Sequence, residues 1–173
     1  MIESGLLTKN DRVELLEGRI VDKMSQNPPH GGTVTHIGDC LTKLAAEKWY
    51  VRIQCPITLN KSEPEPDLAV VPRSRETWLV RHPYPEDIEI VIEVADSTVL
   101  TDRREKGALY AAAGIREFWL VNLVSRKLEV YTKPKAGKSA KYGHCREYKK
   151  NETVPLVLGG KTVAELAVSE LIP

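Results

Sequence analysis

The stretch Ile88–Val94 constrains the possible folds of this chain more than any other segment, because all of its residues except Glu89 and Glu93 are β-branched. A run of this kind is typical of a central strand with both faces covered. Alternation places Glu89, Val91 and Glu93 on one face. Glu93 lies deepest, and burying an unpaired carboxylate costs many kcal/mol. The sequence therefore predicts that Glu93 forms a structural salt bridge, accepts hydrogen bonds or binds a metal.

The remaining pattern predicts an α/β domain with a mixed sheet. Residues 33–48 carry apolar side chains at helical spacing, and residues 102–113 form a second predicted helix that ends at Gly114. We expect strands at 51–59, 67–71, 88–94, 116–121 and 127–131, a β-hairpin at 13–21, loops at 28–32 and 72–87, and a short helix at 163–166.

Composition limits the class of protein. A chain of 173 residues fits one domain spanning 1–173. The 25 basic and 24 acidic residues give a net charge of +1, which excludes histone-like binding but not a local basic patch. The three cysteines are far apart, so we expect neither a disulfide framework nor a zinc site, and the cytoplasm is the simplest location. No apolar run reaches the ~18 residues that a membrane span needs.

Two further segments carry candidate catalytic side chains. Asp67 begins a strand, and alternation turns it to the same side as Glu65. The plain alternative is that Glu63 and Glu65 are solvated loop residues and Asp67 only starts the strand. Asp102, Lys106 and Tyr110 follow one another at intervals of four, close to one helix face. The plain alternative for Asp102 and Lys106 is a surface ion pair, which contributes little stability.

A carboxylate from each of two strands and a lysine from the next helix together form a divalent-metal site. Mg²⁺ takes oxygen ligands and keeps several waters, so Asp67, Glu93 and a substrate phosphate suffice, and Mn²⁺ can substitute. Such an ion lowers the pKa of its bound water and stabilises charge on phosphoryl oxygens. Lys106 would orient the attacking water or neutralise charge at phosphorus. The combination predicts phosphodiester hydrolysis.

Several short motifs follow one another in a characteristic order. They are Glu14-Leu15-Leu16-Glu17-Gly18, Pro29-His30, Gln54-Cys55-Pro56-Ile57, Glu65-Pro66-Asp67-Leu68-Ala69-Val70-Val71, Val91-Ile92-Glu93-Val94, the helix of Asp102, Lys106 and Tyr110, and Ala113-Gly114-Ile115-Arg116-Glu117-Phe118-Trp119-Leu120-Val121. Across about residues 10–132, the sequence resembles the Uma-two family of the PD-(D/E)XK restriction-endonuclease-like superfamily.

This resemblance implies a restriction-endonuclease-like core, in which helices flank a mixed central sheet. It places Asp67 at the aspartate and Glu93 at the second acid of the superfamily motif. The superfamily lysine usually follows that acid by two positions, where this chain has Ala95. The resemblance therefore implies that Lys106, on the following helix, replaces the missing lysine.

The resemblance also implies residues that complete the site. An acid from the N-terminal region often does so, and Glu14 matches the more constant position, with Glu17 as the alternative. His30 would contact the substrate or a metal ligand, or close a loop at a helix N-terminus. Gln54 would reach the substrate from its strand.

The sequence of residues 133–150 predicts that this segment forms an exposed loop or an edge hairpin. This segment contains a cluster of basic residues that either contacts the phosphate backbone of a nucleic acid or forms a solvated surface, the commoner role of charge runs. The cluster consists of Lys133, Lys135, Lys138, Lys141, Arg146, Lys149 and Lys150.

Two functional hypotheses follow. The first is a Mg²⁺-dependent endonuclease that cleaves DNA, with Asp67 and Glu93 on the metal, Lys106 assisting the water and Glu14 in support. The second is a non-catalytic nucleic-acid- or partner-binding module that retains the nuclease scaffold and uses the acids as structural pairs. The superfamily often dimerises, so a two-fold homodimer is expected.

Overall fold

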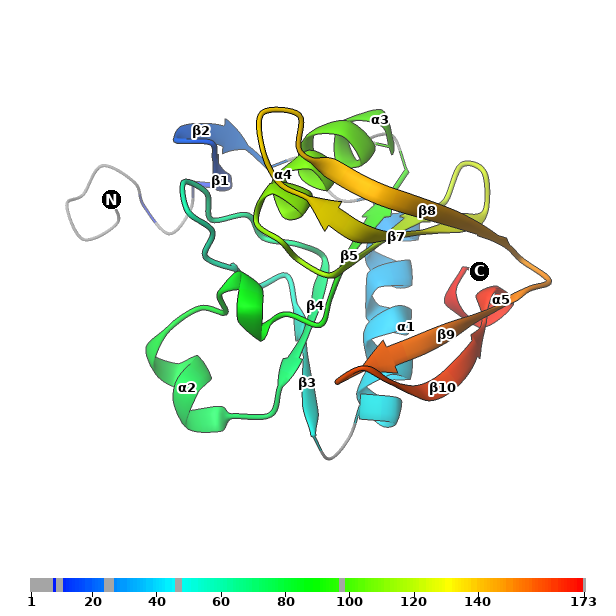
Figure 1. Ribbon diagram of the computed structural model, residues 1–173. Helices are drawn as coiled ribbons and strands as arrows, with labels where there is room; N and C mark the ends of the chain where they lie inside the picture. Colours follow the sequence, from blue (N-terminus) through cyan, green and yellow to red (C-terminus); the bar gives the residue numbers. More distant parts are fainter. Residues whose placement is uncertain (1–7, 9–10, 24–26, 46–47, 97–98, 173) are drawn as a thin grey trace.

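A six-stranded mixed sheet forms the centre of the computed structural model, which describes residues 8, 11–23, 27–45, 48–96 and 99–172 (Figure 1). The strands, in their order across the sheet, are β3 (Trp49–Ile53), β4 (Leu68–Pro72), β5 (Ile90–Ala95), β6 (Glu117–Asn122), β7 (Lys127–Lys135) and β8 (Lys141–Lys149). Strands β5 and β6 run parallel, and all other neighbours in this sheet are antiparallel. The predicted mixed sheet is confirmed.

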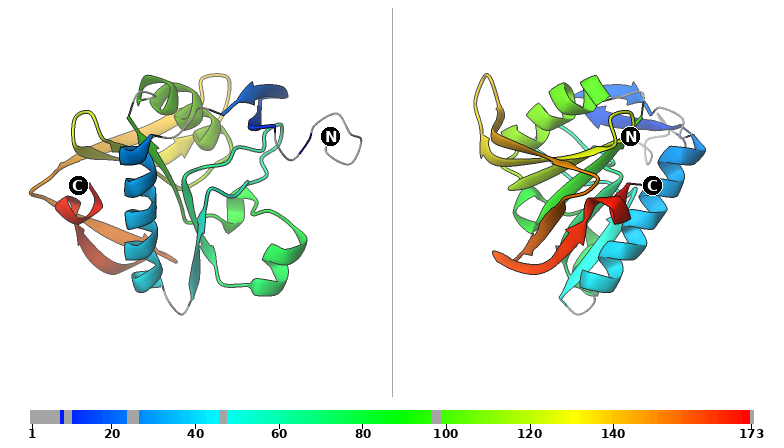
Figure 2. Two further views of the ribbon diagram at one scale, coloured as in Figure 1. Left: turned by 180° about the vertical axis from the view of Figure 1, so that it is seen from behind. Right: turned by 90° about the vertical axis from the view of Figure 1, so that its right-hand side faces the viewer.

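Both faces of β5 are covered, as its sequence predicts. Ile90, Ile92 and Val94 face a core shared with α1 and the C-terminal hairpin, while Val91 and Ala95 face a second core under α4. Helix α1 and the C-terminal hairpin lie on the same side of the sheet (Figure 2). The covering elements are α1 (Pro28–Ala45), β9 (Thr153–Leu158), β10 (Lys161–Ala167), α5 (Val168–Leu171) and α4 (Gly107–Ala112).

The helix over the second face contains a π-helical turn. It runs without a break through α3 (Val99–Thr101), the π-helical turn η2 (Asp102–Lys106) and α4. Such turns occur often at functional sites. The helix ends at Ala112, Gly114 in the following turn has a φ of +79°, and the Ile115 N–H donates to the Tyr110 carbonyl. The predicted helix and its glycine cap are confirmed.

Two predicted hairpins are also present. In the first, β1 (Val13–Leu16) and β2 (Arg19–Asp22) flank Glu17 and Gly18, whose positive φ angles are those of a tight hairpin turn. The second is the pair β7–β8, so the segment 133–150 belongs to an edge hairpin rather than a loop. Its tip approaches the β1–β2 hairpin (Figure 1).

The predicted loop at 28–32 is wrong, because α1 begins at Pro28. Proline is tolerated in the first turn of a helix, where its missing N–H would have no partner in any case. The Asn27 side chain caps this end by accepting a hydrogen bond of 3.0 Å from the His30 N–H. The helix predicted over 33–48 ends at Ala45 among the described residues, and positions 46–47 lie outside them.

The predicted short helix at 163–166 is also wrong, because these residues belong to β10, which pairs with β9. The signal for this hairpin is Gly159-Gly160, where both φ angles are positive. The strand predicted at 51–59 ends at Ile53, and Gln54 follows with a φ of +50°.

The predicted loop at 72–87 contains two short helical segments. They are α2 (Arg75–Val80) and the 3₁₀ turn η1 (Pro85–Asp87). Among the described residues, no helix is both long and apolar enough to cross a membrane.

Replacing Gly114 with alanine should lower the free energy of unfolding by about 1 kcal/mol, because a Cβ disfavours the left-handed backbone there. An added Cβ would meet no atom within 4 Å, so the loss reports backbone conformation alone. Gly32→Ala is the matched control: its surroundings are equally open, but it lies within α1 and should gain up to about 1 kcal/mol. Urea denaturation measures both, and equal effects would contradict the assigned role of Gly114.

Candidate functional site

An acidic pocket lies where the β1–β2 hairpin, the N-terminus of α1, the segment before β4, the end of β5 and η2 meet. Its volume of about 270 Å³ has room for several waters, each of which occupies roughly 30 Å³ in the liquid. The side chains predicted for the site all line it: Glu14, His30, Gln54, Asp67, Glu93 and Lys106. The structure therefore brings these residues together, and their chemical roles stay predictions.

The walls of the acidic pocket carry far more acids than bases. Two lysines and one histidine, Lys23, Lys106 and His30, face eight carboxylates. The carboxylates are Glu14, Asp22, Glu65, Asp67, Glu93, Asp96, Asp102 and Glu105. Such an excess of one sign attracts cations and repels phosphate.

Glu93 is the most deeply buried acid of the pocket, at 2% exposure. Its Oε1 accepts a hydrogen bond of 2.5 Å from the Tyr110 hydroxyl and lies 3.1 Å from Lys106 Nζ. Burial raises the pKa of Glu93 to about 8, opposed by the charge of Lys106 and reinforced by Asp67 and Asp102. The buried carboxylate is thus both paired and hydrogen-bonded, as its position in β5 requires.

Lys106 reaches into the acidic pocket from the end of η2. Its Nζ lies 3.8 Å from Asp102 Oδ1 as well as close to Glu93, and Asp102 itself is buried. The plain alternative of a surface ion pair is therefore corrected in its location, since Asp102 and Lys106 both line the acidic pocket. Burial acts to lower the pKa of Lys106, but Glu93, Glu14 and Asp102 outweigh it and raise that pKa. Lys106 is accordingly a permanent cation near neutral pH.

Asp67 stands just before β4, beside the end of β5. Its Oδ2 accepts a hydrogen bond of 2.8 Å from the Val94 N–H and lies 3.1 Å from His30 Nε2. The hydrogen bond to Asp67 raises the pKa of His30, against the opposing effect of burial. Because His30 lies in the first turn of α1, the helix start holds the imidazole against the end of the sheet.

The two candidate N-terminal acids occupy different places. Glu14 lines the acidic pocket, and its Oε2 accepts a hydrogen bond of 3.1 Å from the Glu65 N–H. Glu17 lies at the hairpin turn and lines a neighbouring groove instead. The geometry therefore favours Glu14 over Glu17.

Gln54 lines the acidic pocket, and its N–H donates to the Asp67 carbonyl over 3.0 Å.

Sequence reasoning missed a hydrogen-bonded ion pair that connects η2 to the sheet. Arg103 Nε donates to Glu129 Oε2 over 3.0 Å, and a second guanidinium nitrogen binds the other carboxylate oxygen. Glu129, on β7, is only 2% exposed and also accepts hydrogen bonds from Tyr131 and Asn122. The position of Glu129 among apolar residues of a strand could have indicated a buried ion pair, as the position of Glu93 did.

The donor set suits a hard cation that keeps part of its water shell. Within the described ranges, no three His, Cys, Asp or Glu side chains stand close enough together to hold a metal ion by themselves. Asp67 and Glu93 instead offer two carboxylates, which with water and phosphate oxygens match the habit of Mg²⁺. The surplus of acids around them would be relieved by such a cation.

In metal-free solution, the wild type should lose stability relative to Glu93→Gln as the pH rises from about 4.5 to about 8. The raised pKa means that the folded state still holds a proton that the unfolded state has released. Between these two pH values, the free energy of unfolding of the wild type should fall by up to about 1.4 kcal/mol per pH unit relative to Glu93→Gln, and above them the difference should stay constant. Urea denaturation in the presence of a chelator measures it, and parallel pH profiles for the two proteins would contradict the assignment.

Comparison with known proteins identifies the family. A family model for Uma2, described as "Putative restriction endonuclease", matches residues 4–168, whereas no curated protein matches the chain. A solved structure of a putative nuclease belonging to DUF820 from Anabaena variabilis ATCC 29413 has a TM-score of 0.70 at 16% identity, over 98% of this chain and 94% of that one. This likeness confirms the restriction-endonuclease-like fold. Since the family model spans nearly the whole sequence, the chain belongs to the Uma2 family.

Proposed function

We propose that this protein is a metal-dependent nuclease that hydrolyses phosphodiester bonds in DNA. The observation that carries the proposal is the meeting of Asp67, Glu93 and Lys106 in one acidic pocket. The family description and the nuclease named among the similar structures support the same chemistry. The expected homodimer and cytoplasmic location are further parts of the proposal.

The charge of the acidic pocket supports a metal-dependent mechanism. A phosphate that approached the eight carboxylates alone would be repelled. Asp67 and Glu93 would hold Mg²⁺, or Mn²⁺ in its place. When bound, the ion supplies Lewis-acid stabilisation of the phosphoryl oxygens and a bound water of lowered pKa.

The protein's own side chains have separate tasks. Lys106 is protonated, so it acts as a donor and positive charge near the attacked phosphate and not as a base. Tyr110 fixes the orientation of Glu93 through its hydroxyl. Glu14 supports the metal or its water from the β1–β2 hairpin, while His30 and Gln54 line the pocket where the substrate would enter.

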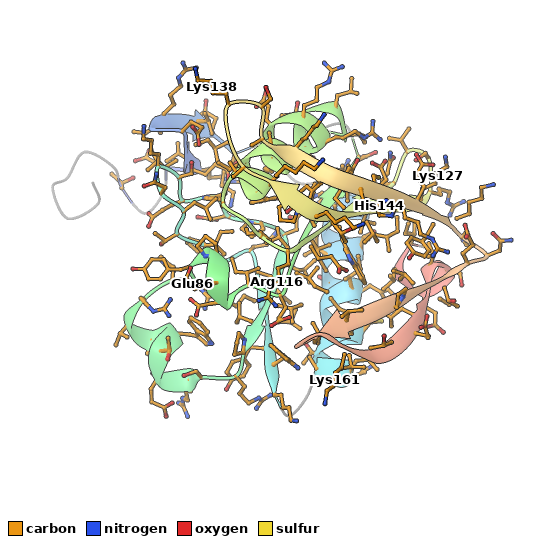
Figure 3. All side chains as sticks on the ribbon, viewed as in Figure 1. Glu86, Arg116, Lys127, Lys138, His144 and Lys161 are labelled. Carbon is orange, nitrogen blue, oxygen red and sulfur yellow. The ribbon has the colours of Figure 1, made fainter. Side chains whose placement is uncertain are left out.

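Asp67→Asn should abolish Mg²⁺-dependent nicking of a supercoiled plasmid, with a loss of at least about 100-fold, because the substitution removes a metal-binding charge worth several kcal/mol. Glu86→Gln is the matched control, since Glu86 is an exposed residue of η1 (labelled in Figure 3) that does not line the acidic pocket. Gel electrophoresis measures nicking, and isothermal titration with Mg²⁺ measures binding. Equal nicking by Asp67→Asn and wild type would remove Asp67 from the mechanism. A wild type that binds no Mg²⁺ would favour the non-catalytic module.

Lys106→Gln should reduce nicking by about 100-fold, the usual effect of removing one donor that stabilises developing charge. Its loss should also shift the pH midpoint of Mg²⁺ binding upward, because Lys106 is the charge that restrains the pKa of Glu93. Titration of Mg²⁺ binding across pH measures this shift. An unchanged midpoint would show that Lys106 and Glu93 are not coupled.

A further inference from the structure

A second, larger groove lies beside the acidic pocket. We call it the hairpin groove, because its walls are the β1–β2 hairpin, α4 and the tip of the β7–β8 hairpin. Its volume is about 840 Å³. It shares part of its lining with the acidic pocket, namely Leu16, Val21, Glu105 and Lys106. A chain that passes Lys106 can therefore continue directly into the hairpin groove.

The floor of the hairpin groove is apolar. Ala108, Leu109 and Ala112 of α4 face Leu16 and Val21 of the first hairpin across it. None of these side chains is fully buried, so the groove offers apolar surface to a bound molecule. The apolar floor distinguishes the hairpin groove from the acidic pocket.

The rim of the hairpin groove is basic. Arg19 and Lys138 line it from opposite walls and join Lys106, while Glu17 and Glu105 are the acids of its lining. Beyond the rim, the β7–β8 hairpin carries no acid between Val130 and Arg146 but several exposed lysines. Figure 3 shows Lys138 at the tip of this hairpin, next to the β1–β2 hairpin. The local charge is therefore opposite to that of the acidic pocket.

We propose that the hairpin groove receives a single DNA strand as it leaves the acidic pocket, with its phosphates on Arg19 and Lys138 and its sugars and bases on the apolar floor. The inference rests on the proposed nuclease function. A volume of about 840 Å³ lies in the range of small-molecule sites, so it accommodates a few nucleotides of one strand and not a duplex. Base faces are available to an apolar floor only where a strand is unpaired.

Charge separates the two halves of this path. The phosphate in the acidic pocket needs a divalent cation, but the phosphates in the hairpin groove meet arginine and lysine directly. Single-stranded DNA should therefore bind with no divalent metal present. Its affinity should fall with salt, because each phosphate neutralised by the protein releases condensed counterions.

The test is fluorescence anisotropy of a fluorescein-labelled single-stranded oligonucleotide, in EDTA and at several KCl concentrations, against the same oligonucleotide in a duplex. Arg19→Ala/Lys138→Ala removes two proposed phosphate contacts, each of which contributes about 0.7 to the steepness of log affinity against log salt. The double variant should therefore reduce the magnitude of that slope by about 1.4. Lys161→Ala is the matched control, because Lys161 is an exposed lysine on β10, remote from the groove (Figure 3). It should bind like the wild type.

A second pair of variants tests the floor. Ala112→Glu puts a negative charge at an exposed position of the groove and should weaken binding more than Ala112→Gln, which has the same length without the charge. Both changes lie on the surface of α4, so circular dichroism and thermal unfolding verify that the fold is retained. Equal binding by the two variants would contradict a polyanion in the groove.

The outcomes separate this proposal from the nuclease function. The proposed role of the hairpin groove is contradicted if Arg19→Ala/Lys138→Ala keeps the wild-type affinity and salt slope, or if the duplex binds more tightly than the single strand. This holds even if Asp67-dependent nicking is observed. Loss of binding in that double variant supports the groove even if no nicking occurs with Mg²⁺ or Mn²⁺, in which case only the catalytic proposal fails.

Discussion

The hydrogen bond and the ion pair made by one buried glutamate, Glu93, connect the site of this protein to its core. Glu93 lies in the middle of the sheet, where a buried carboxyl group is tolerated because it has a hydrogen-bond donor and a cation beside it. Tyr110 and Lys106 supply them from the helix above, so that helix is fixed over β5. Tyr110 also packs edge-on against Phe118 of β6, with ring centroids 5.4 Å apart, which ties the same helix to the next strand. The site and the core thus depend on the same contacts.

Much of this arrangement could be predicted from the sequence, because alternation in a strand is a strict rule. Alternation placed Glu93 on the same face as Val91, which α4 covers in the structure, and motif order pointed to Asp67 and Lys106. The helix position of Lys106 was predictable, but the π-helical turn that carries it was not. The side chain of Arg103 in that turn pairs with Glu129 of β7, which lies 26 positions further along the chain.

The wrong predictions have physical reasons of their own. The dipeptide Pro28-Pro29 suggested a loop, yet proline is compatible with a first helical turn, and the Asn27 cap decides in favour of the helix. Residues 163–166 have apolar side chains at both helical and strand spacing, so their periodicity is ambiguous. Pairing with β9 beyond the Gly159-Gly160 turn resolves it. Both deciding signals, the Asn27 cap and the Gly159-Gly160 turn, therefore stand in the local sequence.

The position of β8 at the border of the sheet has a consequence for self-association. A border strand exposes unpaired backbone groups that invite another strand to add, and proteins often deter this with lysines. Strand β8 begins at Lys141 and ends at Lys149, so antiparallel addition of a second copy would bring like charges face to face. Pairing of two molecules through β8 is therefore disfavoured, and this edge of the sheet stays accessible.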